Sequence, residues 1–275
     1  MRNIISLFIR YSAFILFLVL ECFSFYLIIN YNKSQKEIWA NSSNLLTGGV
    51  NSYVQGVEDF FALQNRNDSL LIENAKLLET IINYRINSKN NNFQEFEDSD
   101  STANYQLIPS RLCSKTINLR NNFMTLCKGS QDSIEVGMGV ITENGIAGIV
   151  SQVSKDFSTV LMILNSESRT SAKVKSKNYF GNLQWRSDNP LLMTLTDVPK
   201  HAEIVIGDTV VTSGFSISFP EDVYIGTIYD YSIQDGSNSY NIDVELATDF
   251  SKTDYVYVVS YKLAEQKEQL IDSDE

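Results

Sequence analysis

The chain of 275 residues carries 22 Lys and Arg against 33 Asp and Glu, a formal net charge of -11. Such an acidic chain is a poor partner for phosphate backbones, which argues against nucleic-acid binding. One His, His201, and three Cys leave too few soft ligands for a closed zinc site and a single candidate for acid–base catalysis near neutral pH. We therefore expect no metal, no cofactor and no enzymatic activity, and favour a binding or scaffolding protein.

Residues 11–29 form an apolar run interrupted only by Ser12, Glu21 and Ser24. A helix of this length reaches about 28 Å, close to the roughly 30 Å hydrocarbon core, so we expect one transmembrane helix. The short segment 1–10 would stay in the cytoplasm and the bulk of the chain would lie outside it. A cleaved signal peptide is the alternative, but the run is long and no small-residue cleavage site follows. Glu21 either faces another membrane helix or is protonated or snorkelling.

Residues 30–86 are expected to form a coiled-coil stalk, because apolar residues follow a seven-residue repeat after Gly48-Gly49. Asn residues at two a positions favour a two-stranded pairing, so we predict a parallel homodimer. The alternative is a single amphipathic helix that lies on its own β domain. The predicted dimer seam consists of Tyr53, Phe60, Leu63, Asn67, Leu70, Asn74, Leu77 and Ile81.

Residues 87–104 are rich in Asn, Ser and acidic residues and are expected to be a linker, and residues 261–275 an acidic tail. Between them, residues 105–260 alternate β-branched and aromatic residues with turn signals such as Asn144-Gly145, which predicts an all-β body. A weak repeat at an offset of 70 aligns Gly137 with Gly207 and predicts two similar small β units.

Three patterns that could indicate chemistry have simpler interpretations. The string Gly137-Met138-Gly139 precedes a strand rather than opening a helix, so we interpret it as a turn. Asp208 and Ser213 suggest a serine hydrolase, but the only base is His201, in an expected loop, and no nucleophile elbow is present. Cys113 and Cys127 flank an expected hairpin. A disulfide between them is chemically allowed, but we favour buried free thiols because most registers would not pair them.

The order of these parts and three strings resemble the MreC family of rod shape-determining proteins. The strings are ENAKLLE at 73–79, GMGVITENGIAGIVSQVSKDFSTVLMIL at 137–164 and GDTVVTSGFSISFPEDVYIGTI at 207–228. Glu221-Asp222 stands where the family tends to place a Gly turn, so that loop is expected to differ. The residues expected to form structural turns and barrel corners are Gly145, Gly148, Gly207, Asp208, Ser213, Gly214, Phe219, Pro220 and Gly226.

The resemblance implies a mainly β protein, with a transmembrane helix, a coiled-coil stalk and two small six-stranded β-barrels in the periplasm. It implies a single-pass inner-membrane scaffold of the cell-wall elongation machinery, which self-associates as dimers or filaments. The implied partners are MreD, the actin-like MreB and a class B penicillin-binding transpeptidase. The alternative function is a periplasmic adaptor of a transporter, although such adaptors usually carry a helical hairpin inserted within the β body.

Overall fold

The computed structural model describes residues 11–31, 63, 65–88, 104–186, 189–233 and 238–264. The chain divides into two units, Met1–Ser69 and Leu70–Glu275, which are described separately. Several predicted features lie outside the described residues: segment 1–10, seam residues Tyr53 and Phe60, positions 89–103 of the linker and the tail beyond residue 264.

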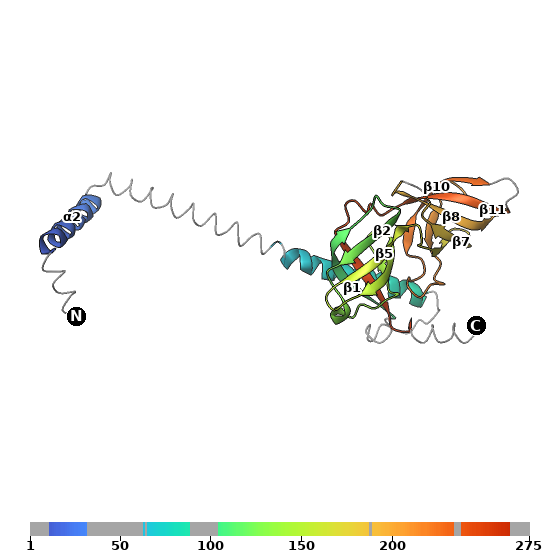
Figure 1. Ribbon diagram of the computed structural model, residues 1–275, viewed down its shortest axis with the longest axis horizontal. Coiled ribbons are helices and arrows are strands. Elements are labelled where there is room, and N and C mark those ends of the chain that lie inside the picture. The colour runs from blue at the N-terminus through green and yellow to red at the C-terminus, as the bar shows by residue number, and fades with distance from the viewer. Residues whose placement is uncertain are drawn as a thin grey trace. The chain divides into compact units, whose positions relative to one another are not determined.

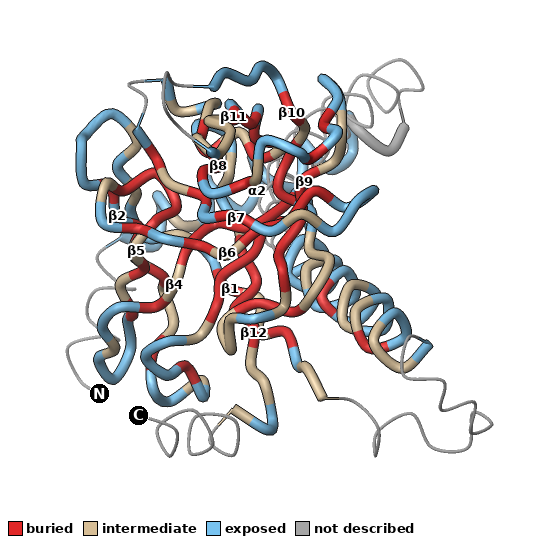
Figure 2. Tube along the Cα trace, turned by 90° about the vertical axis from the view of Figure 1, so that its right-hand side faces the viewer, coloured by how far each residue is buried: buried red, intermediate tan, exposed pale blue. Residues whose placement is uncertain are grey.

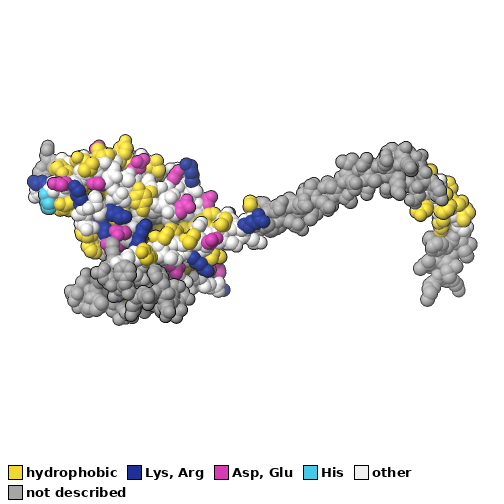
Figure 3. Space-filling model, turned by 180° about the vertical axis from the view of Figure 1, so that it is seen from behind, with side chains coloured by type: hydrophobic (Ala, Val, Ile, Leu, Met, Phe, Trp, Pro, Cys, Tyr) yellow, Lys and Arg dark blue, Asp and Glu magenta, His cyan; other side chains and the backbone are white. Residues whose placement is uncertain are grey.

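The first unit contains helix α2 (Ser12–Tyr31), whose side chains are described as far as Ile28. Large apolar side chains are exposed along it, among them Phe14, Phe17 and Phe23 at 61%, 60% and 58%. Figure 3 shows hydrophobic side chains gathered along the described part of this helix. No helix built from described residues has the length and hydropathy required to cross a membrane.

The described residues of the second unit form twelve strands in two closed barrels (Figure 1). The first barrel has the strand order β1-β12-β3-β4-β5-β2. Its strands are β1 (Tyr105–Lys115), β2 (Asn121–Leu126), β3 (Gly139–Ile141), β4 (Ile146–Val153), β5 (Ser158–Asn165) and β12 (Tyr255–Tyr261), and the short 3-10 helix η1 (Ser130–Asp132) precedes β3.

The second barrel has the order β10-β11-β8-β7-β6-β9. Its strands are β6 (Thr170–Val174), β7 (Tyr179–Gln184), β8 (Leu192–Pro199), β9 (Thr209–Thr212), β10 (Tyr224–Ile233) and β11 (Ser239–Leu246). This barrel is inserted between β5 and β12, so the chain returns to close the first barrel, where Tyr105 pairs with Tyr261 and Tyr257 with Ile141. The predicted mainly β architecture with two six-stranded barrels is confirmed.

The two barrels repeat one local geometry at the turns aligned in the sequence. Gly137 and Gly207 have φ values of +89° and +91°, which favour glycine. The Gly137 N–H donates to the Val150 carbonyl at 2.9 Å, and the Gly207 N–H donates to the Ile228 carbonyl at 2.8 Å. Each turn leads into a short strand, β3 or β9, so the offset of 70 residues reflects two equivalent barrel corners.

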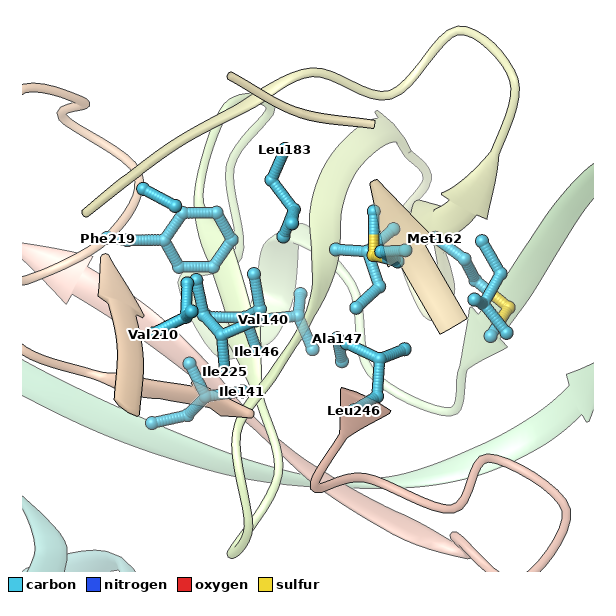
Figure 4. Close-up of a cluster of buried hydrophobic side chains, with 14 of the residues drawn as sticks. Val140, Ile141, Ile146, Ala147, Met162, Leu183, Val210, Phe219, Ile225 and Leu246 are labelled. Atoms are coloured by element: carbon cyan, nitrogen blue, oxygen red, sulfur yellow. The ribbon is translucent and has the colours of Figure 1, made fainter. Parts of the chain in front are cut away.

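Buried apolar side chains fill both barrels and continue between them. Figure 2 shows buried residues concentrated along the strands. Figure 4 shows one cluster that combines Val140, Ile146 and Met162 of the first barrel with Val210 and Ile225 of the second. All five are at most 1% exposed, so the two barrels share a hydrophobic core.

A disulfide joins Cys113 and Cys127, and our preference for buried free thiols was therefore wrong. Cys113 lies at a register shift between β1 and β2, and the Cys127 N–H donates to the Arg111 carbonyl at 3.0 Å. This irregular pairing brings the two Cα atoms to 5.3 Å, a separation that a disulfide spans readily. Cys113 is also exposed rather than buried.

Candidate functional site

Residues 65–88 form a helix, and from Leu70 onward one side of it packs on the first barrel. Ala75 is 3% exposed and belongs to the barrel core, and Leu78 and Ile82 pack against the same core. These residues follow the spacing of one helix face. Contact with the barrel, which was the alternative to a coiled coil, therefore accounts for one face of this helix.

Two polar side chains of the helix form hydrogen bonds with β1 and the residue before it. The Asn83 side-chain oxygen accepts the N–H groups of Asn104 and Tyr105, both at 3.1 Å, and its amide donates to the Tyr105 carbonyl at 2.9 Å. The Glu79 carboxylate accepts the Leu107 N–H at 3.2 Å. These bonds satisfy backbone N–H and carbonyl groups at the start of β1. The helix and the barrel wall are therefore joined in a defined register.

A second apolar row on the same helix is exposed, and we call it the ridge. It consists of Leu70, Leu77, Ile81 and Tyr84, which are 57%, 56%, 46% and 59% exposed; in the other unit, the predicted seam residue Leu63 is 66% exposed. Three of its members, Leu70, Leu77 and Ile81, are seam positions predicted from the heptads, and Tyr84 is the next position of the same repeat. Successive helical residues are about 100° apart, so the ridge lies beside the face that contacts the barrel.

The two Asn residues of the predicted seam are both exposed. The Asn74 side chain lies near the Tyr257 hydroxyl on β12. Burial and the nearby Glu143 carboxylate raise the pKa of Tyr257, and the polar Asn74 side chain opposes that rise. Asn74 therefore already has a contact within its own chain.

The predicted turn residues gather at the junction between the barrels. Phe219, 1% exposed, lies against Gly139, where an added Cβ would meet the Ser218 carbonyl and the Phe219 ring. A Cβ on Gly145 would lie 2.9 Å from the Tyr224 carbonyl oxygen. The Thr142 and Thr248 hydroxyls share a 2.9 Å hydrogen bond beside it. The segments at the junction therefore lie too close together to leave room for a side chain on Gly139 or Gly145.

The remaining motif residues shape strands and loops in both barrels. Asp208 accepts the Val205 N–H at 3.0 Å, and the buried Pro220 accepts a bond from Thr212 through its carbonyl. A Cβ on Gly148 would collide with the Leu161 carbonyl, and one on Gly226 with the Glu245 carbonyl. These contacts are between main-chain segments, as expected where strands approach closely.

Lys173 on β6 makes a buried ion pair that the sequence did not indicate. Its side chain is 4% exposed and contacts the carboxylates of Glu221 and, at 3.0 Å, Asp222. Asp222 has φ +64°, so an Asp adopts the left-handed conformation where the resemblance suggested a Gly. The departure from the family pattern thus supplies a charge partner for Lys173.

The residues considered for catalysis have separate partners. The Ser213 hydroxyl lies 2.9 Å from that of Ser171 and accepts the Phe215 N–H, whereas the exposed His201 contacts the ring of Tyr179. Among the described residues, no group of three or more His, Cys, Asp or Glu could hold a metal ion. Ser213 and His201 thus contact different residues.

Comparison with known proteins identifies the family. The model described as "Rod shape-determining protein MreC, barrel core" matches residues 112–260. The chain belongs to the MreC family. The cell shape-determining protein MreC of Listeria monocytogenes is 30% identical over 189 residues, which are 66% of this chain and 63% of that protein. MreC of Escherichia coli is 26% identical over 191 residues, 69% of this chain and 51% of its own length.

The chain therefore spans less than two thirds of these MreC relatives. Among solved structures, MreC of Listeria monocytogenes is similar with a TM-score of 0.56 and 25% identity, covering 72% of this chain and 96% of that one. MreC of Pseudomonas aeruginosa has a TM-score of 0.52 at 22% identity, over 56% of this chain and 98% of that one, a likeness of fold. The resemblance to MreC found in the sequence is thus confirmed.

Proposed function

We propose that this protein is a membrane-anchored periplasmic scaffold of the cell-wall elongation machinery, and that it acts as a dimer through the ridge. Membership of a cell shape-determining family supports the role. The observation that carries the proposal is the ridge: an apolar row of heptad spacing that stays exposed although its helix already packs on a barrel. Burying such a row against a second copy stabilises a two-stranded contact.

Two further features support a location outside the cytoplasm with an anchor in the membrane. The disulfide between Cys113 and Cys127 is a bond that persists in oxidising compartments. Helix α2 is apolar on all sides and exposes large side chains, as a helix surrounded by lipid does. The proposed anchor is the whole of segment 11–29.

The proposed partners are a second copy of the chain, MreD, MreB and a class B penicillin-binding transpeptidase. Membership of the MreC family supports this proposal. In this proposal the β body binds partners and carries out no catalysis, which agrees with the separate contacts of Ser213 and His201.

The test replaces Leu70 and Leu77 together by Asp. Both side chains are more than half exposed, so the fold should persist while the dimer loses its apolar contact. Sedimentation of the purified chain should shift from dimer to monomer, and cells that rely on the variant should lose their rod shape.

Matched substitutions separate dimerisation from folding. Lys76→Asp places the same carboxylate at an exposed position off the ridge, where it reverses a charge, and should leave both mass and cell shape unchanged. Leu78→Asp, on the face that packs against the barrel, should lower the melting temperature instead. An unchanged mass for the Leu70/Leu77 variant would refute the dimer, and a defect in export rather than shape after depletion would favour a transporter adaptor.

A further inference from the structure

Outside the ridge and the barrel junction core, the second unit contains a cavity of about 690 Å³. It lies where three segments meet: the turn between β1 and β2, the connection from β5 to β6, and the end of β7. Its described lining includes three arginines, Arg120, Arg169 and Arg186, and no described acidic residue. This concentration of positive charge contrasts with the net charge of -11 of the whole chain.

Among the described residues, which leave out 187 and 188, no carboxylate forms an ion pair with the three guanidinium groups. In the part of the chain that the structure describes, the ion pairs involve Lys115, Lys173, Lys177 and Lys252 and none of these arginines. Like charges that line one cavity repel each other, and a bound anion would relieve that repulsion.

Local hydrogen bonds orient two of the three guanidinium groups. Arg169 donates through Nη1 to the carbonyls of Ser166 and Ser168, both at 2.8 Å. Arg186 donates through Nε to the Gln184 side chain at 3.1 Å. A guanidinium has five N–H donors, so most donors of both groups have no described partner.

The backbone that carries these arginines is fixed by the fold. The Ser166 N–H donates to the Arg120 carbonyl at 3.2 Å, which ties the β1–β2 turn to the connection between the barrels. Trp185, next to Arg186, is 8% exposed, and its Nε1 donates to the Asn189 carbonyl at 3.4 Å. The cavity is therefore built from both barrels.

We propose that this cavity binds a ligand that carries a phosphate or diphosphate group. The planar fork of Arg matches the oxygens of phosphate, and three positive charges without an ion-pair partner among the described residues suit a group with two or more negative charges better than a single carboxylate. The volume is within the range of small-ligand sites. This binding is additional to the scaffold role and does not depend on the ridge.

The experiment titrates inorganic pyrophosphate into the full chain, held in nanodiscs of phosphatidylcholine at low ionic strength, by calorimetry. One pyrophosphate should bind per chain, and the affinity should fall as salt is added. Arg169→Gln and Arg186→Gln should each weaken binding by about tenfold or more. Arg111→Gln, an exposed arginine on β1 outside the cavity, is the matched control and should bind like the parent.

A second arm distinguishes a lipid phosphate from a soluble one. If the ligand is a lipid headgroup, phosphatidic acid in the nanodisc should compete and weaken pyrophosphate binding to the parent chain. If the ligand is soluble, the affinity should not change. Equal binding by the parent and both cavity variants would overturn the proposal, and so would tighter binding of an oligoglutamate peptide than of pyrophosphate.

Discussion

Gly207 and Gly214 both adopt positive φ, +91° and +81°, but their surroundings differ. Nothing lies within 4 Å of a Cβ built on Gly207, whereas one on Gly214 would lie 2.7 Å from the Cβ of Glu221. The first position is thus restricted by backbone conformation alone, and the second also by contact with a residue that pairs with Lys173.

We predict that Gly207→Ala lowers the free energy of unfolding by about 1–2 kcal/mol, the cost of the left-handed conformation. Gly214→Ala should cost more, because the added methyl group also displaces Glu221. Urea denaturation of the two variants compares these costs directly. Equal losses would mean that the Glu221 side chain moves aside without cost.

At the residue scale, the contribution of Tyr105 to folding stability depends on pH. Burial and the stacked Tyr261 raise its pKa from about 10 to about 12. Because the folded-state pKa is above the unfolded one, its contribution to stability is complete below about pH 10 and is lost as the pH rises toward about 12.

Tyr105→Phe removes this ionisation but keeps the backbone bonds to Asn83. The free energy of unfolding of the variant should therefore fall less steeply between pH 10 and pH 12 than that of the parent. Thermal melts at intervals of pH measure the two slopes, and identical slopes would contradict the assignment to Tyr105.

At the scale of elements, the 65–88 helix is attached to the first barrel by an apolar face and by Asn83. Asn83 is 9% exposed and makes three hydrogen bonds to residues 104 and 105. The end of the helix and the start of β1 are therefore coupled across the intervening segment.

Asn83→Ala should lower the free energy of unfolding by about 1–3 kcal/mol, because it leaves buried backbone groups without a partner. Hydrogen exchange of the Tyr105 amide should become faster, while amides in the second barrel keep their protection. Thr80→Ala, at an exposed position of the same helix, is the control and should change neither measurement. Unchanged exchange at Tyr105 would show that the apolar face alone holds the helix.

At the scale of the whole molecule, the second barrel is inserted into the sequence of the first. The two barrels therefore differ in how their strands are distributed along the chain. The strands of the second barrel follow one another from β6 to β11, whereas the first needs β12 from the end of the body. β12 contributes Val256 and Val258, both 0% exposed, and pairs with β1 and β3.

A chain that ends at residue 250 should therefore keep the second barrel and lose the first. Without β12, β1 and β3 become open edges and core side chains are lost, so hydrogen exchange should rise in β1 and β3 but not in β7 and β8. A chain that ends at residue 264 is the control. Uniform loss of protection would mean that the shared core makes the barrels one cooperative unit.

Local patterns in the sequence determined the β class of the body, the repeat that aligns Gly137 with Gly207, and the apolar heptads of the helix. These features depend on residues close together in the chain, where the periods of strands and helices are directly readable. The heptads identified the ridge residues Leu70, Leu77 and Ile81, but they did not indicate that Ala75, Leu78 and Ile82 pack on the barrel.

Only the tertiary structure decided which distant residues meet. The irregular register of β1 and β2 pairs Cys113 with Cys127, and the approach of β6 to the loop after Phe219 brings Lys173 to Glu221. The arginine-lined cavity is formed by three segments far apart in the chain. Such contacts depend on strand register and barrel closure, which no local period encodes, because a shift of one residue turns every side chain of a strand to its other face.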